Sequence, residues 1–179
     1  RQRAASEGID AEFVCADGGV HPFPAASFDW IVSRFGVMFF RDPVSAFANI
    51  RHAAASEAQV RFITWRQPSE NPFMTTAERT AAPVLPHLPA RELNAPGQFG
   101  LADPLFTRGV LERSGWENIQ LRPLDVECRF AADPLESYFT RLGPVAQALQ
   151  QVDDEQRRQV IAALHRAFAP VVGGEREVP

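Results

Sequence analysis

Lysine is absent from this sequence of 179 residues, and all 18 basic side chains are arginine. Without lysine there can be no phosphate-binding loop of the Gly-x-x-x-x-Gly-Lys type. Only two cysteines occur, which excludes a disulfide framework and favours a reduced, cytoplasmic setting. No apolar run approaches the ~20 residues of a membrane helix, and the net charge of −4 argues against a surface built for nucleic-acid phosphates. We therefore expect neither a membrane nor a nucleic acid as partner.

Motifs for several other chemistries are missing as well. The sequence has no Gly-x-Ser-x-Gly nucleophile elbow and no Gly-x-Gly-x-x-Gly dinucleotide fingerprint. Cys15 and Cys128 have no His or Cys neighbours at metal-ligand spacing, so no metal site is predicted. A serine hydrolase of the elbow type and a cysteine-based zinc domain are thereby excluded.

The segment between residues 28 and 65 predicts a strand, a helix and a second strand. Phe28–Ser33 is apolar on both alternating faces, which indicates a strand buried from both sides. Asp42 and Pro43 form an N-cap and first-turn pair, and apolar residues then recur at helical spacing to about Ala55. Gln59–Trp65 is the next β-prone run. Because no hairpin signal separates the strands, their order predicts a βαβ crossover and a parallel sheet.

Further elements are predicted on either side of this unit. Helices are expected over 73–82 and 104–114, at the capping-box-like start at 133 and from 153 onward, and strands over 12–16, 118–125 and 127–130. The last two strands have the partial alternation of an antiparallel edge. Six prolines interrupt the segment 67–100, which we expect to be either a lid over the sheet or a plain connector.

Two short segments at strand ends are candidates for ligand binding. At Asp17 an acid can accept a hydrogen bond from an exocyclic amine, and Gly18 lets a flat ring approach the backbone. Ser33, Arg34 and Phe35 end the next strand, and their backbone could hold a small charged ligand. The alternatives are a plain Asp-Gly turn and a solvated arginine beside a core phenylalanine.

Histidine supplies the candidate for proton transfer. His21 lies in the loop after Asp17, at the expected ligand edge, which makes it a candidate proton acceptor. The other histidines lie among polar helical residues or in the proline-rich segment. A structural or solvated role is the alternative for each of them.

Taken together, these motifs resemble a class I S-adenosylmethionine-dependent methyltransferase of the type 11-like group. The resemblance is carried by Phe13–Gly18, His21–Pro24, Ser27–Phe40, Phe99–Pro104 and Arg113–Trp116. It covers roughly residues 1–125 and implies an α/β fold, with a Rossmann-like, mostly parallel sheet, flanking helices and an antiparallel last strand. The family's glycine-rich loop and its ribose-binding acid have no counterpart in this sequence. The resemblance therefore implies a core that is N-terminally incomplete.

The resemblance also implies roles for the candidate residues. In the family, the acid that ends the third strand bonds the adenine amino group of S-adenosylmethionine, which maps to Asp17, with Gly18 lining the ring. The backbone after the fourth strand meets the methionine part of the cofactor, which maps to the Ser33–Phe35 segment. The acceptor would be a small molecule that attacks the methyl group in line. His21 would serve as a base where that acceptor must lose a proton.

The expected organisation has five parts. They are the second half of the core at 1–66, the lid or insertion at 67–100, the final helix and strands of the core at 101–130, C-terminal helices at 131–170 and a tail at 171–179. The function expected from the resemblance is methyl transfer to a small-molecule acceptor, as part of a larger domain. The alternative is a non-catalytic methyltransferase-like module that forms a homo-oligomer or binds a partner, since exposed apolar edges favour association.

Overall fold

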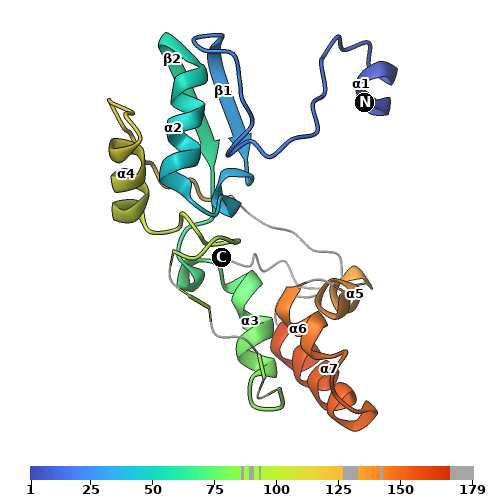
Figure 1. Ribbon diagram of the computed structural model, residues 1–179. Coiled ribbons are helices and arrows are strands. Elements are labelled where there is room, and N and C mark those ends of the chain that lie inside the picture. The colour runs from blue at the N-terminus through green and yellow to red at the C-terminus, as the bar shows by residue number, and fades with distance from the viewer. Residues whose placement is uncertain (86, 89–90, 93, 127–132, 142, 170–179) are drawn as a thin grey trace.

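The computed structural model describes residues 1–85, 87–88, 91–92, 94–126, 133–141 and 143–169. In chain order the elements are α1 (Gln2–Ser6), β1 (Phe28–Arg34), η1 (Val37–Phe39), α2 (Pro43–Ala53), β2 (Ala54–Ile63), η2 (Pro68–Glu70), α3 (Pro72–Ala81), α4 (Pro104–Arg113), α5 (Asp133–Arg141), α6 (Gly143–Ala148) and α7 (Asp154–Phe168). Figure 1 shows the strands with α2 and α4 in the upper part of the view, and α3 with α5, α6 and α7 in the lower part.

The central unit is the predicted βαβ crossover. β1 and β2 pair in parallel, with Trp30 beside Gln59, so the mixed α/β fold with a parallel sheet is confirmed. α2 begins where expected, because the Asp42 carboxylate accepts a hydrogen bond from the Ser45 N–H at 3.1 Å. Bonds from the Ser45 hydroxyl and N–H hold the pKa of the Asp42 carboxyl below its ordinary value. β2 begins at Ala54, directly after α2, which is earlier than the predicted range.

One face of the sheet, α2 and α4 enclose what we call the sheet core. Its buried members are Val37, Met38, Phe47, Ile50, Ala54, Leu101, Val110, Leu111 and Trp116. The Trp116 indole Nε1 donates to the Phe47 carbonyl at 3.1 Å, which fixes the segment after α4 against α2. Trp116 also has the Arg51 guanidinium 5.6 Å from its ring centroid. The helix–sheet arrangement therefore rests on both packing and a buried hydrogen bond.

Among the described residues, nothing covers the other face of the sheet, which corrects the expectation that the first strand is buried from both sides. Trp30 and Val32 of β1 are 55% and 75% exposed, and Ile63 of β2 is also exposed. Within the described ranges, α2 lies on one face only, and the opposite face has no such helix. The Arg61 guanidinium lies 4.9 Å from the Trp30 ring centroid and shields part of that face.

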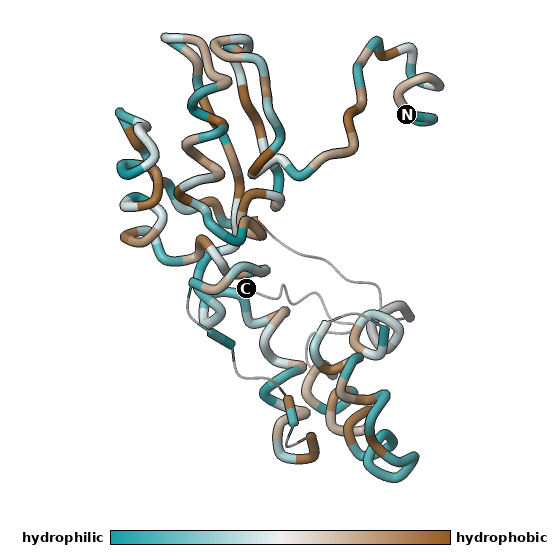
Figure 2. The backbone as a smooth tube through the Cα atoms, viewed as in Figure 1, coloured by the Kyte–Doolittle hydropathy of each residue, from teal (hydrophilic) through white to brown (hydrophobic). Residues whose placement is uncertain are grey.

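The lower helices form a second, separate hydrophobic cluster, which we call the helical core. Its buried members are Ala77, Ala81, Leu85, Phe139, Val145, Leu149, Val160, Leu164 and Phe168. Figure 2 shows hydrophobic residues in this bundle as well as in the two strands. α3 lies within the segment 67–100, yet its buried residues pack with α6 and α7. The part of the chain expected to lie over the sheet therefore shares a core with the C-terminal helices, and its role as a lid stays a prediction.

Two of the predicted strands are not formed. Residues 12–16 and 118–125 have irregular structure, and residues 127–130 lie outside the described part of the chain. A strand requires a neighbour to pair its backbone groups, and neither run pairs with β1 or β2. Ile119 instead packs against the sheet core, and its carbonyl accepts a hydrogen bond from the Arg108 guanidinium at 3.3 Å. Pro123 also lacks the N–H that a ladder needs.

Candidate functional site

The carboxyl ends of β1 and β2 meet at one edge of the sheet, which is where ligands of open α/β sheets gather. Phe35 follows β1 and Trp65 comes shortly after β2. Their rings are stacked, with centroids 4.4 Å apart and an interplanar angle of 13°. The Trp65 ring also meets Phe73 of α3, with centroids 5.7 Å apart. A row of half-buried aromatic rings therefore lies at this edge.

The loop that begins at Asp17 borders the same edge before it runs along α2 to the start of β1 (Figure 1). The Asp17 Oδ1 accepts the Gly19 N–H at 2.9 Å, which forms an Asx turn. The Asn49 amide of α2 donates to the carbonyls of Gly18 and His21 at 3.4 and 2.9 Å. These bonds hold the loop on α2 and leave the Asp17 side chain exposed.

The two glycines of this loop have different surroundings. A Cβ on Gly18 would meet no atom within 4 Å, so its backbone faces open space that a flat ring could enter. A Cβ on Gly19 would lie 3.2 Å from the Asp17 Oδ1 and 3.3 Å from the Phe40 ring, so packing favours glycine there. In the described ranges, the Gly19 N–H is the one hydrogen-bond partner of the Asp17 carboxylate. Its second oxygen is thus open to an amine of a ligand.

The segment after β1 has a distinctive backbone. Phe35 has a φ of +56°, in the left-handed region, and its N–H donates to the Ile63 carbonyl at 3.0 Å. The Arg34 guanidinium lies 5.5 Å from the Phe35 ring centroid. A Cβ on Gly36 would lie 3.1 Å from the Ser33 Oγ. The predicted Ser33–Phe35 site is therefore a tightly turned strand end. Phe40, whose ring lies beside Gly19 of the Asp17 loop, follows it a few residues later in the chain.

His21 lies in the same loop, and its ring packs on a neighbour. Its ring meets the Phe23 ring edge-on, with centroids 4.7 Å apart and an interplanar angle of 79°. The His21 N–H donates to the Asp17 carbonyl at 2.9 Å. The imidazole position is therefore coupled to the Asp17 loop, and its catalytic role stays a prediction.

Sequence reasoning missed Asn49, Trp65 and Phe73 as members of this region. Asn49 lies on a helix, and Trp65 was placed at the end of a strand, with no local pattern to pair either with a distant segment. The signal that could have found Trp65 is its position after a parallel strand, since strand ends converge. Phe73 belongs to this region only because α3 brings its ring against Trp65, and the sequence does not predict where α3 packs.

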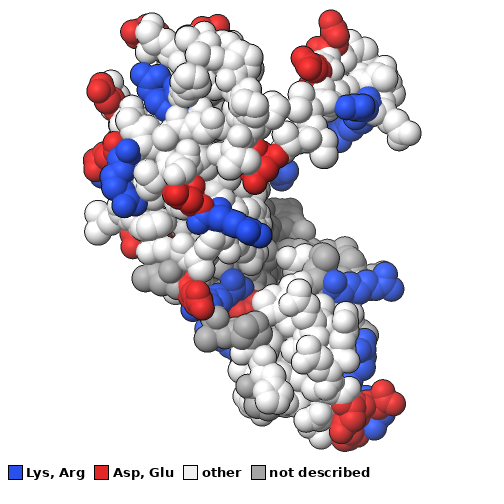
Figure 3. Space-filling view, viewed as in Figure 1, with Lys and Arg blue, Asp and Glu red and all other residues white. Residues whose placement is uncertain are grey.

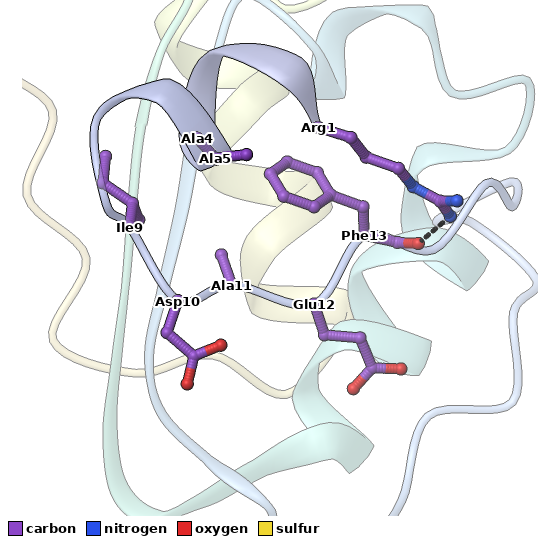
Figure 4. A pocket seen from close by; sticks show the side chains of 8 residues that line it. All are labelled: Arg1, Ala4, Ala5, Ile9, Asp10, Ala11, Glu12 and Phe13. Carbon is purple, nitrogen blue, oxygen red and sulfur yellow. Dashed lines mark hydrogen bonds between the residues drawn. The ribbon is translucent and has the colours of Figure 1, made fainter.

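An open pocket of about 410 Å³ lies elsewhere, in the N-terminal segment (Figure 4). All of its lining residues fall within residues 1–13, and the Arg1 guanidinium donates to the Phe13 carbonyl at 2.7 Å across it. α1 stands apart from the strands in Figure 1. This pocket is therefore distinct from the strand-end site, which shares none of its residues.

The structure adds three general observations on function. Figure 3 shows acidic and basic side chains interspersed over the visible face. Among the described residues, no group of three or more His, Cys, Asp or Glu side chains is arranged to hold a metal ion. Within the same ranges, no helix combines the length and apolarity required to cross a membrane.

Comparison with known proteins bears on the N-terminal part of the chain. Residues 1–62 match the family model described as Methyltransferase domain. The matched segment contains β1, α2, most of β2 and all residues predicted to bind cofactor. The comparison with curated proteins gave no match. This match confirms the resemblance to the methyltransferase family over residues 1–62.

Proposed function

We propose that this chain serves methyl transfer from S-adenosylmethionine to a small-molecule acceptor. The observation that carries the proposal is the position of Asp17. It lies within the matched segment, at the carboxyl edge of a parallel sheet, with an exposed carboxylate beside the open backbone of Gly18. An exposed acid next to an accessible backbone suits the recognition of an amino-substituted flat ring.

In this proposal, residues at this edge contact the cofactor at both of its ends. The Asp17 carboxylate would accept a hydrogen bond from the adenine amino group, while the space at Gly18 admits the ring. The turned backbone of Ser33–Phe35 would hold the methionine part. When bound, S-adenosylmethionine supplies a methyl group on a sulfonium, which is open to in-line attack. The contribution of the protein is to fix the orientation of the reactants.

His21 is the candidate base for acceptors that lose a proton on methylation. Its backbone is bonded to Asp17 and Asn49, so the loop that would bind adenine also determines where the imidazole lies. The Phe23 ring packs against the imidazole and restricts its orientation. In this role His21 would accept the acceptor's proton while the methyl group moves.

Replacing Asp17 by alanine is expected to weaken cofactor binding. The substitution leaves the adenine amino group without its partner, which typically costs about 1–3 kcal/mol, or roughly 5- to 150-fold in Kd. Calorimetric titration with S-adenosylhomocysteine measures the change. Asp29→Ala, which removes another exposed carboxylate from β1, is the matched control and should bind as the unsubstituted chain does. Unchanged affinity in Asp17→Ala would contradict the proposal.

A second function, self-association without catalysis, is favoured by the uncovered face of the sheet. Phe28, Trp30, Val32 and Ile63 are all exposed there. The first three alternate along β1, and Ile63 is two residues beyond Arg61, the partner of Val32 on β2. Contiguous exposed apolar side chains mark association surfaces in many proteins. We propose that, in this non-catalytic role, a second copy of the chain covers the exposed face of the sheet.

Val32→Asp tests that second candidate. Val32 is 75% exposed, so a carboxylate there is tolerated in a monomer but would be desolvated in an apolar interface. We expect light scattering after gel filtration to show an oligomer for the unsubstituted chain and a monomer for Val32→Asp. Val20→Asp, at a loop residue that is 77% exposed, is the control and should remain oligomeric. A monomeric unsubstituted chain would exclude this candidate.

A further inference from the structure

The Trp65 ring stacks on the Phe35 ring, and the proposed function gives this contact no role. We infer that Trp65 is a positioning residue, which holds Phe35 in the left-handed backbone conformation that shapes the strand end for its ligand. The ligand part of this inference rests on the proposed function. The structural part, the dependence of the Phe35 backbone on the Trp65 ring, does not.

The first step concerns the backbone of Phe35. Its φ of +56° places a bulky side chain in a region that non-glycine residues seldom occupy. Such a conformation persists only where the surroundings determine it more strongly than the local preference opposes it. The chain would relax toward a commoner conformation if those surroundings were removed. Contacts at this strand end must therefore hold the Phe35 backbone in its left-handed conformation.

The second step identifies the restraint, which comes from the end of β2. The Phe35 N–H donates to the Ile63 carbonyl at 3.0 Å, and the Phe35 ring stacks on Trp65 with 4.4 Å between centroids. The near-parallel rings, 13° apart, provide a broad apolar contact. Arg34 is exposed, and its guanidinium, 5.5 Å from the Phe35 centroid, is a looser contact. Phe35 also packs against the sheet core, and the Trp65 ring is the aromatic side chain that stacks directly on it.

The third step concerns what fixes Trp65 itself. Its ring meets Phe73 of α3 at an interplanar angle of 66°, and α3 belongs to the helical core. Next to Phe73, the Met74 sulfur accepts a hydrogen bond from the Gln98 amide at 3.0 Å. Trp65 is therefore held between the strand end and a separately packed group of helices, and it can transmit the position of α3 to Phe35.

The fourth step connects Phe35 to ligand binding. The φ of residue 35 decides in which direction the chain leaves β1 toward η1, whose Val37 and Met38 are buried. Gly36 already packs closely, since a Cβ there would lie 3.1 Å from the Ser33 Oγ. A change at Phe35 would reorient the Ser33–Gly36 backbone, which is the part proposed to hold the methionine end of the cofactor. Small misplacements of binding groups of this kind have large effects.

A double-mutant cycle tests the inference on the full chain. Trp65→Leu and Phe35→Gly are made singly and together, because glycine adopts a φ of +56° without strain. Trp65→Leu alone should raise the Kd for S-adenosylhomocysteine about tenfold, as expected for loss of an aromatic pair, and should speed exchange of the Phe35 amide. In the Phe35→Gly background, Trp65→Leu should leave the Kd nearly unchanged. Trp65→Phe keeps a ring for stacking and should restore both readouts.

Two controls separate positioning from general destabilisation. Trp30→Leu removes an exposed tryptophan from the opposite face of the sheet and should change neither readout. Exchange of the Phe47 amide, in the buried middle of α2, reports on global opening and should stay constant. Equal losses of affinity in both Phe35 backgrounds, or unchanged exchange of the Phe35 amide, would overturn the inference. A lack of binding by the unsubstituted chain would overturn the proposed function, while the exchange data would still decide the role of Trp65.

Discussion

Replacing Phe47 by alanine is expected to lower the free energy of unfolding of the sheet core by about 3–5 kcal/mol. The Phe47 side chain is 0% exposed, and the rings of Phe40 and Phe62 flank it with centroid distances of 5.9 and 5.4 Å. Truncation would leave a cavity between α2 and the strands, because the helix backbone is tied to Trp116 and cannot move inward freely. The lost contacts and the cavity both reduce stability.

Chemical denaturation monitored by circular dichroism measures the effect. Phe39→Ala is the matched control, since Phe39 is 56% exposed on η1 and its loss should stay within about 0.5 kcal/mol. A domain of this size has a net stability of about 5–15 kcal/mol. The Phe47 variant should therefore lose a large share of it. Similar losses in the two variants would contradict the packing described for α2.

Gly100→Ala is expected to have the next largest effect, a destabilisation of about 1–3 kcal/mol. A Cβ on Gly100 would overlap the Met38 carbonyl oxygen and lie 2.9 Å from that of Ala95. Both are backbone atoms, so no side chain can rotate away to make room. The Met38 carbonyl also accepts the Gly97 N–H at 3.0 Å, and a shift would break this link between the segment before α4 and η1.

Gly109→Ala provides a control of opposite sign for that substitution. Gly109 lies on α4, and a Cβ there would meet no atom within 4 Å. Alanine is favoured over glycine inside a helix, so this change should stabilise the protein by about 0.5–1 kcal/mol. Thermal denaturation of the two variants should therefore shift in opposite directions. An unchanged midpoint for Gly100→Ala would show that the segment 94–100 can move away from Met38.

The features that were predicted correctly from sequence depend on short-range rules. Asp42 and Asp103 each precede a proline and begin a helix, and in the structure the Asp103 carboxylate accepts the Leu105 N–H at 2.8 Å. Such caps are determined by neighbouring residues. β1 was found from its apolar run, and its parallel pairing with β2 followed from the lack of a turn between them.

The features that were missed depend on contacts between distant parts of the chain. Residues 12–16 and 118–125 are β-prone, but a strand forms only when a partner is in place. The stacking of Phe35 on Trp65 and the φ of Phe35 have no signature in the local sequence. At the candidate site, Asp17 and the Ser33–Phe35 segment are indicated by their positions at strand ends, and the family resemblance implies their binding roles, which stay predictions.

The helical core also has a consequence for synthesis of the chain on the ribosome. α3 packs against α7, yet about fifty residues separate the end of α3 from the start of α5, and α7 comes later still. At translation rates of about 5–20 residues per second, the apolar side of α3 waits several seconds for its partners. The sheet core can be completed in that interval, because α4 emerges before α5. The order of emergence thus favours assembly of the βαβ unit first and closure of the helical bundle last.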